Sequence, residues 1–364
     1  MTLSLYFTRR FLKSVAQVLL VFFGILMLID MVEQLRRFSP QGIGLAGAAE
    51  LALLNVPASL YRILPLIVVF ASIALFLALS RSSELVVARA AGRSGLRFLL
   101  APVGTALVLG CAVVAVLNPF VAATSKQYDA LYSRQAQGGE SIFSINESGL
   151  WLRQGGADGQ TVIRAARSDL DGTRLFAASF LIFDAEGAPV QRIEADEAVL
   201  RAGEWALTGA KYWDLTARNP EVSSRIENTA ALPSELTPER IRDSFGDPSA
   251  IPIWSLPDYI TRLELAGFSA RTHRVWFQME LALPLLLASM VLVAAGFTMR
   301  HARGGKTGQM VLFALLGGFG IFFLRNFAQV LGESGQIPVA LAAWSPPVAA
   351  LLLSLGLLLH LEDG

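Results

Sequence analysis

Six stretches of the chain are almost entirely apolar, and they fall into two groups of three. Each stretch is apolar all round a helix rather than along one face, which is typical of a segment surrounded by lipid. A bilayer core about 30 Å thick requires around 20 residues of helix. We therefore predict six transmembrane helices, at Ser14–Ile29, Ile63–Ser80, Phe98–Ser125, Leu281–Met299, Thr307–Leu324 and Ser334–Leu361. Asp30, at the end of the first stretch, is the one carboxylate that this pattern assigns to the spans.

Between the third and fourth stretches, the pattern changes to short runs of alternating apolar and polar residues separated by turn residues. The segment Glu186-Gly187-Ala188-Pro189 is typical of a turn between two strands, and a second turn is predicted at Arg201–Glu204. The predicted strands are Gly149–Arg153, Arg174–Phe183, Val190–Ala195, Ala198–Leu200 and Trp205–Thr208. This spacing indicates an antiparallel β domain, either a sandwich or a jellyroll. A short helix is expected at Asp258–Leu265, before the chain returns to the membrane.

Basic residues in the short loops predict how the helices are oriented. They precede the first span, join the second to the third, and join the fourth to the fifth. These residues are Arg9, Arg10 and Lys13, then Arg81, Arg89, Arg93 and Arg97, then Arg300, Arg303 and Lys306. All three clusters fall on one side if every stretch crosses once, and basic loops are typically cytoplasmic. Both termini are therefore expected in the cytoplasm and the β domain on the opposite side.

The predicted fold is an α+β membrane protein with three parts. Residues 1–125 carry three helices, residues 126–270 the β domain with its connecting segments, and residues 271–364 three more helices. The composition agrees, since 54% of the 364 residues are hydrophobic and 16% are charged, whereas soluble domains have about 25% charged residues. The net charge of +1 gives no indication of a nucleic-acid partner. The single cysteine, Cys111, cannot form an internal disulfide, so the β domain must be stabilised by its own core.

The cytoplasmic loop at about 82–92 is predicted to form a short helix. Good helix formers extend from Glu84 to Ala91, and Gly92 can end the helix. Leu85 lies on a small apolar face beside Glu84 and Arg89. Such a helix can dock a soluble partner, or it can rest on lipid headgroups as an ordinary amphipathic loop.

Cations near the non-cytoplasmic ends of the spans form a candidate binding site for a lipid phosphate. Arg36 and Arg37 follow the first span, and Lys126 and Arg134 extend the third. Guanidinium groups match phosphate geometry. The alternative is simple anchoring at headgroups, or salt bridges to Glu33 and Asp129. Arg325 in the fifth span faces either an internal cavity or the headgroup boundary, because a charge at mid-bilayer costs at least about 2.5 kcal/mol.

Sequence motifs for catalysis are not found. The segment Gly304-Gly305-Lys306-Thr307 is similar to the end of a phosphate-binding loop, but Arg300 stands where that motif needs glycine. The histidines at positions 273, 301 and 360 do not have metal-ligand spacing. The chain is therefore predicted not to be an enzyme.

Several segments together resemble the LptF/LptG (YjgP/YjgQ) permeases of the lipopolysaccharide export ABC transporter, and the resemblance covers nearly the whole chain. These segments are Tyr6-x-x-Arg9-Arg10, Asp30-Met-Val-Glu-Gln-Leu-Arg-Arg37, Pro57 to Pro65, Ser83 to Ser94, Pro284, Gly335-Gln-Ile-Pro338 and Ala343-Trp344-Ser-Pro346. The segment Ser-Glu-Leu…Arg-Ala-Ala-Gly within 83–94 is the most specific. The paired basic residues that end the first span are more similar to the LptG branch.

The resemblance implies a periplasmic β-jellyroll and an assembly in the bacterial inner membrane. It implies a heterodimer with an LptF-like permease, a dimer of the LptB-like ATPase, and an LptC-like membrane-anchored partner. ATP and Mg²⁺ would be bound by the ATPase, so no cofactor is expected on this chain. By this resemblance Glu84, Leu85, Arg89 and Gly92 belong to the helix that docks on the ATPase. Arg36, Arg37 and Arg134 match basic positions that meet the lipid A phosphates and core sugars, whereas Lys126 and Arg325 are added from their positions alone.

The function expected on this basis is extraction of lipopolysaccharide from the outer leaflet of the inner membrane and its transfer toward the periplasmic bridge. Two other classes of protein are compatible with parts of the sequence. One is a mechanotransmission permease that acts on periplasmic partners without transporting lipid, although such permeases usually have four spans. The other is a membrane-anchored scaffold or sensor, which needs neither a docking helix nor a basic rim.

Overall fold

The computed structural model describes residues 2–39, 43–82, 95–135, 143–146, 149–156, 159–169, 172–234, 236–237, 241, 247–299 and 307–362. The chain divides into two compact units. The membrane unit consists of Met1–Gln135, Ser249–Trp254 and Arg271–Gly364. The β unit consists of Ala136–Pro248 and Ser255–Ala270. The short segment Ser249–Trp254 therefore belongs with the helices, although strands precede it and a helix of the β unit follows it.

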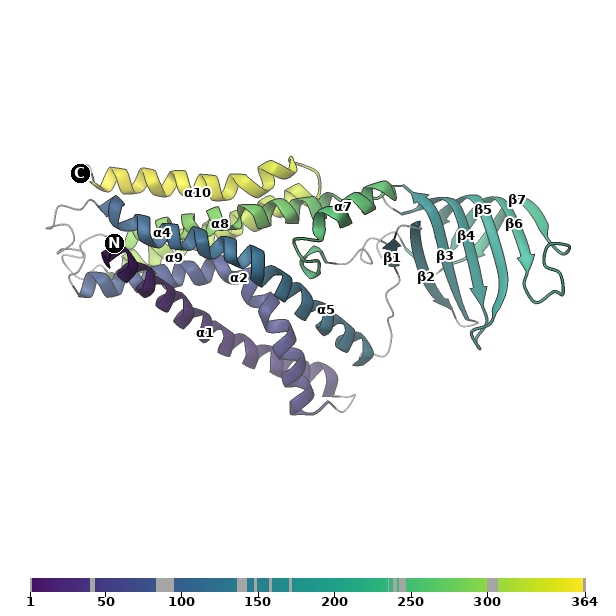
Figure 1. Ribbon diagram of the computed structural model, residues 1–364, viewed down its shortest axis with the longest axis horizontal. Helices are drawn as coiled ribbons and strands as arrows, with labels where there is room; N and C mark the ends of the chain where they lie inside the picture. The colour runs from purple at the N-terminus through teal and green to yellow at the C-terminus, as the bar shows by residue number, and fades with distance from the viewer. Residues whose placement is uncertain are drawn as a thin grey trace. The chain divides into compact units, whose positions relative to one another are not determined.

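Six helices in the described part of the membrane unit are long and apolar enough to cross a bilayer, as the sequence predicted. They are α1 (Thr2–Phe38), α2 (Leu45–Arg81), a third that joins α4 (Gly95–Ala112) through the π-helical turn η2 (Val113–Leu117) to α5 (Asn118–Gln135), then α8 (Arg271–Thr298), α9 (Thr307–Glu333) and α10 (Val339–Glu362) (Figure 1). Each of these helices begins or ends beyond the apolar stretch that predicted it, because a helical backbone continues through polar flanking residues once its hydrogen bonds are established. The expected start of the fourth span at Leu281 is ten residues later than the start of α8 at Arg271.

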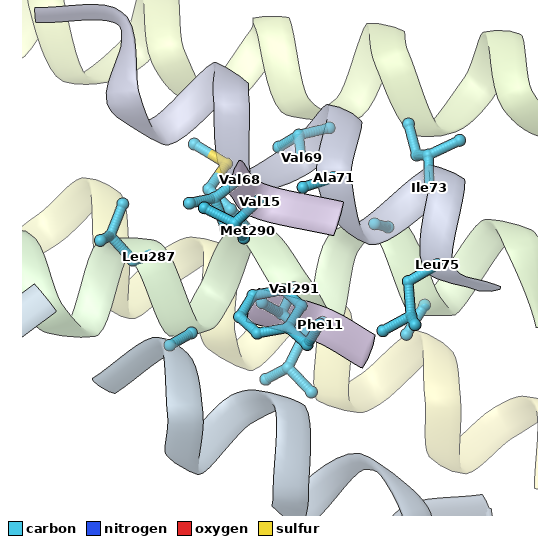
Figure 2. Close-up of a cluster of buried hydrophobic side chains, with 14 of the residues drawn as sticks. Phe11, Val15, Val68, Val69, Ala71, Ile73, Leu75, Leu287, Met290 and Val291 are labelled. Carbon is cyan, nitrogen blue, oxygen red and sulfur yellow. The ribbon is translucent and has the colours of Figure 1, made fainter. Parts of the chain in front are cut away.

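The core of the membrane unit lies around α2 and α8. Phe11 from α1 packs among Val68 from α2 and Val291 from α8, and all three are essentially inaccessible to solvent (Figure 2). A close approach between α4 and α8 depends on Gly110, where an added Cβ atom would lie 2.5 Å from the Cα of Pro284. Helices α2 and α8 therefore form the centre of the unit, whereas the outer faces of α1 and α9 expose apolar side chains.

The β unit contains one antiparallel sheet in which each described strand pairs with the next one along the chain. The strands are β1 (Phe143–Asn146), β2 (Gly149–Gly156), β3 (Gly159–Ser168), β4 (Arg174–Phe183), β5 (Pro189–Arg201), β6 (Glu204–Asp214) and β7 (Arg225–Pro233) (Figure 1). Both predicted hairpin turns are present, since Phe183 pairs with Pro189 and Arg201 with Glu204. The inserted antiparallel β domain is thus confirmed. The described strand order is a meander because short turns join successive strands, whereas a jellyroll also has crossover connections.

One face of the sheet carries the core of the β unit. Phe180 and Trp205 are fully buried there, with ring centroids 6.2 Å apart. Helix α7 (Leu256–Leu265) adds Leu263 to this core, and the chain just beyond it adds Phe268. A backbone hydrogen bond of 2.7 Å from Ser168 N–H to the Ala266 carbonyl connects this end of α7 to β3. The β unit therefore has a hydrophobic core without a disulfide.

Candidate functional site

The last turn of α1 presents two exposed arginines. Arg36 and Arg37 both form salt bridges with the carboxylate of Glu33, at 3.0 and 3.4 Å, and their side chains are 78% and 51% exposed. One carboxylate shared by two guanidinium groups leaves a net positive charge at this end of the helix. Exposed salt bridges contribute only about 0–1 kcal/mol. An anionic ligand can therefore replace Glu33 at little cost.

Arg37 also joins α1 to α5. Its Nη1 donates a hydrogen bond of 2.7 Å to the Tyr132 hydroxyl. Together with the salt bridge to Glu33, this hydrogen bond holds the Arg37 side chain in one position. One turn earlier, Gln34 Nε2 donates a hydrogen bond of 3.0 Å to the Tyr128 hydroxyl. These contacts fix Arg37 against a neighbouring helix, whereas the salt bridge of Arg36 within the described part of the chain is to Glu33 of its own helix. Arg36 is therefore the more accessible cation.

The other two predicted cations lie on α5. Lys126 is exposed, and it precedes Tyr128, which faces α1, by two positions. At about 100° per residue the two side chains project roughly 200° apart. The structure therefore places Lys126 on a different side of α5 from the contact with α1. Arg134 is in the last turn of α5, but its side chain lies outside the described part of the structure, so its role stays a prediction.

Arg325 in α9 points into the membrane unit. Its side chain is 8% exposed. Of the two positions that the sequence allowed, the interior and the headgroup boundary, the structure therefore shows the interior. It interacts electrostatically with Glu280 of α8 and with Tyr61 of α2. A buried charge of this kind is tolerated when a charge of opposite sign lies near it. Arg325 is thus part of an internal cluster that joins three helices.

Glu280 is the centre of this buried polar cluster, and sequence reasoning missed it. The residue is 1% exposed. Its Oε2 accepts hydrogen bonds from the Tyr61 hydroxyl and, at 3.4 Å, from Asn118 Nδ2. The sequence pattern assigns only Asp30 to the spans, because Glu280 immediately precedes the apolar run that begins at Leu281. The signal that could have revealed it is Arg325, since a cation within a span calls for an anion nearby.

Asn118 extends the buried polar cluster to the segment that returns from the β unit. Its Oδ1 accepts a hydrogen bond of 2.9 Å from the Ile253 backbone N–H. The indole N–H of Trp254 donates to the Ala115 carbonyl, at 3.2 Å, within the π-helical turn η2. Such turns free a backbone carbonyl and are frequent at functional sites. The segment Ser249–Trp254 is therefore attached to the third membrane helix at a π-turn.

The predicted docking helix falls outside the described residues. Glu84, Leu85, Arg89 and Gly92 all lie in 83–94. Their assignment stays a prediction from the sequence.

Comparison with known proteins identifies the family. The family model described as lipopolysaccharide export system permease LptF/LptG matches residues 5–360. This chain belongs to the LptF/LptG family. Within that family, the chain is 25% identical over 363 residues to the LptG protein of Escherichia coli strain K12, and the match covers 98% of both chains. It is equally similar to LptG of Escherichia coli O6:H1. It is 22% identical to LptG of Haemophilus influenzae, over 100% of this chain and 99% of the relative.

The LptF/LptG match includes every candidate residue described above. Residues 5–360 contain the arginines at the end of α1, the buried polar cluster, the π-turn and the segment 83–94. The match also continues through both units, so the β unit belongs to the family architecture.

Proposed function

We propose that this chain is a permease subunit of a transporter that exports lipopolysaccharide. The match to the LptF/LptG family carries this proposal, because its range, residues 5–360, includes both groups of helices and the β unit. The relatives named as lipopolysaccharide export permeases are covered over nearly their whole length. Six helices of spanning length support the assignment to a membrane.

In this proposal, the end of α1 meets the phosphates of the lipid. Arg36 carries exposed positive charge, and the outer face of α1 presents apolar residues such as Leu28 and Val32, each more than 60% exposed. An apolar surface that ends in a guanidinium group is complementary to acyl chains joined to a phosphorylated headgroup. Arg37 keeps α1 in contact with α5 through Tyr132, and so positions Arg36.

The same proposal places the chain in the bacterial inner membrane, with both termini in the cytoplasm and the β unit in the periplasm. We expect an LptF-like permease to complete the transmembrane cavity and an LptC-like protein to receive the lipid. ATP hydrolysis belongs to an LptB-like ATPase dimer that docks on Glu84–Gly92. The chain itself then transmits movement and contacts the lipid, and binds neither ATP nor Mg²⁺.

The proposal is tested by purification of the chain from detergent-solubilised membranes, followed by mass spectrometry of bound lipids and proteins. We expect lipopolysaccharide to be enriched over bulk phospholipid by about tenfold, together with a second permease and an ATPase. Recovery of phospholipid in the ratio of the membrane, without enriched lipopolysaccharide, would contradict the transport role. Enrichment of the lipid without an ATPase would contradict the assembly.

A further inference from the structure

The β unit carries a hollow of about 480 Å³ that is lined by residues of four neighbouring strands. Small residues form its floor, among them Ala166 in β3, Ala177 in β4 and Gly209 in β6. Long polar side chains from the same strands surround this floor. The concave shape therefore follows from the placement of small residues between large ones.

The floor coincides with an irregularity that crosses the sheet. Buried side chains normally alternate in a strand, yet in four neighbouring strands one step between successive buried residues is of three residues instead of two. These steps are Ala165 to Ser168 in β3, Leu175 to Ala178 in β4, Ala195 to Ala198 in β5 and Leu207 to Ala210 in β6. Ala177 and Gly209, which lie within these steps, have positive φ values of 50° and 64°. The pairing register is the same on both sides of these steps, so the neighbouring strands switch faces together. A non-glycine residue at positive φ, such as Ala177, is a strained position of the kind that clusters at functional sites.

Three cations extend from the rim of the hollow, and aromatic rings hold each of them. The guanidinium of Arg164 lies 5.8 Å from the ring centroid of Trp151. Arg192 and Lys211 lie 5.5 and 4.5 Å from the ring centroid of Trp213. Contacts of this kind are weakly stabilising at an exposed site. The cations are thus partly ordered before any ligand arrives.

Acceptor groups lie between these cations. Arg164 pairs in register with Ser179, Ser179 with Glu194, and Glu194 with Lys211, so that one row of alternating groups crosses four strands. Asp196 adds a second carboxylate, whose Oδ2 lies 2.3 Å from the position of a Cβ atom on Gly209. A side chain at position 209 would displace Asp196 from the floor.

This mixture of groups limits the kind of ligand. The lining carries three cations and two carboxylates, and this net charge of +1 is too small to hold a polyanion. The core of a protein interface is depleted of charged residues and uses accessible aromatic rings, whereas the two indoles here are covered by cations. The volume is typical of a site for a small molecule. A sugar phosphate fits this mixture of groups, because a cation can bind its one anionic group and the acceptors can bind its several hydroxyl groups.

We propose that this hollow binds a phosphorylated sugar unit, with the anionic group at Lys211, where it displaces the exposed Glu221, and the hydroxyl groups at Glu194 and Asp196. The proposal rests on the proposed function in one respect, since lipopolysaccharide is one source of such a unit. A free sugar phosphate has the same chemistry. The two sources are distinguished in the experiment below.

The first arm of the experiment uses the purified full-length chain and glucose 6-phosphate as the probe, with glucose for comparison. Equilibrium dialysis is expected to show binding of glucose 6-phosphate at least tenfold tighter than that of glucose. Ala166→Trp fills the hollow without changing charge and should abolish this binding, as should Lys211→Gln. Ala166→Ser keeps the hollow open and should retain it. Val222→Trp, at a position that is 82% exposed and outside the hollow, serves as the matched control.

The second arm identifies the source in cells with a photoreactive amino acid at Ser179 and, as control, at Val222. An adduct with lipopolysaccharide at Ser179 alone identifies the lipid as the source. Binding of glucose 6-phosphate without a lipid adduct identifies a free sugar phosphate. Equal binding by wild type and Ala166→Trp, when thermal unfolding shows both to be folded, overturns the proposal, as does an adduct with a protein. Failure of the proposed function is detected separately, by the absence of lipopolysaccharide from the purified chain.

Discussion

Glu280 and Arg325 are the two residues whose charges are least expected from their surroundings. Both are buried in the membrane unit and come from different helices, α8 and α9. Each makes the other tolerable, because an ion in a low-dielectric environment needs a compensating charge. Removal of one partner should therefore be more harmful than removal of both.

We predict that Glu280→Leu lowers the free energy of unfolding by about 3–5 kcal/mol, because Arg325 then stays buried without its counter-charge. The double variant Glu280→Leu/Arg325→Leu should recover part of this loss. Denaturant unfolding in detergent measures both effects, with Glu50→Leu, an exposed carboxylate of α2, as control. Equal losses in the single and double variants would show that the two charges are not coupled.

Arg36 and Arg37 are expected to differ in spite of their adjacent positions. Arg36→Glu should reduce the lipopolysaccharide that is recovered with the purified chain several-fold, because it reverses an exposed charge. Its thermal stability should be nearly unchanged, since the exposed salt bridge to Glu33 contributes at most about 1 kcal/mol. Arg218→Glu, in an exposed turn of the β unit, is the control. Unchanged lipid recovery would remove Arg36 from the binding site.

Two carboxylates in the β unit predict a dependence of stability on pH. The hydrogen bond from Lys211, followed by that from the Trp213 indole, lowers the pKa of Glu221. Hydrogen bonds from the hydroxyl and the N–H of Thr216 lower the pKa of Asp214. A pKa that is lower in the folded state stabilises the fold above the unfolded-state value of about 4 and loses this effect as the pH falls through the folded-state value.

We therefore expect the melting temperature to fall between pH 5 and pH 3, and Glu221→Gln should make this fall smaller. Circular dichroism in the β-sheet region follows the transition, with Glu186→Gln in an exposed turn as control. An unchanged slope in Glu221→Gln would exclude Glu221 as a source of the pH dependence.

At the scale of elements, the attachment of Ser249–Trp254 to the third membrane helix depends on Asn118. Its side chain accepts from Ile253 and donates to Glu280, so its loss leaves two buried polar groups without this partner. Each such group costs about 1–3 kcal/mol. The indole of Trp254 is largely exposed and makes a single bond of 3.2 Å to η2. Asn118 should therefore contribute more to the attachment than Trp254.

Asn118→Ala is expected to release the segment Ser249–Trp254 and increase its rate of cleavage by a protease about tenfold. Trp254→Phe, which removes one exposed hydrogen bond, should have a smaller effect. Limited proteolysis of the purified full-length chain, with mass spectrometry of the cut sites, measures both rates. Equal cleavage rates in wild type and Asn118→Ala would mean that packing alone holds the segment.

The same scale shows where the sequence predicted elements and where it did not. Six helices and two hairpin turns were predicted, because apolar length and turn residues are local properties. Strands β1, β3 and β7 were missed. In β7 no residue is buried, so an alternation of apolar and polar residues does not mark this strand. The fourth span was predicted to begin at Leu281, because hydropathy detects only the apolar part of a helix. Helix α8 begins ten residues earlier, at Arg271.

At the scale of the whole molecule, the chain is expected to act only within an assembly. Glu84→Ala, in the segment that carries the most specific resemblance to the family, should reduce recovery of the ATPase with the purified chain about tenfold. Quantitative mass spectrometry of the purified complex measures this ratio, and Glu50→Ala serves as control. Undiminished ATPase in Glu84→Ala would exclude this residue from docking.

The amino-acid sequence by itself determined the number of spans, the inserted β domain and the family, because lipid imposes a length on every apolar helix and short turns are encoded locally. It also located the arginines at the end of α1. Only the tertiary structure decided which buried charges interact. Arg325 and Glu280 are 45 positions apart, and Asn118 and Ile253 are 135 apart, so no local pattern relates them. Packing of the helices brings these residues near one another and removes them from both water and lipid, and each buried polar group must then find its partner inside the protein.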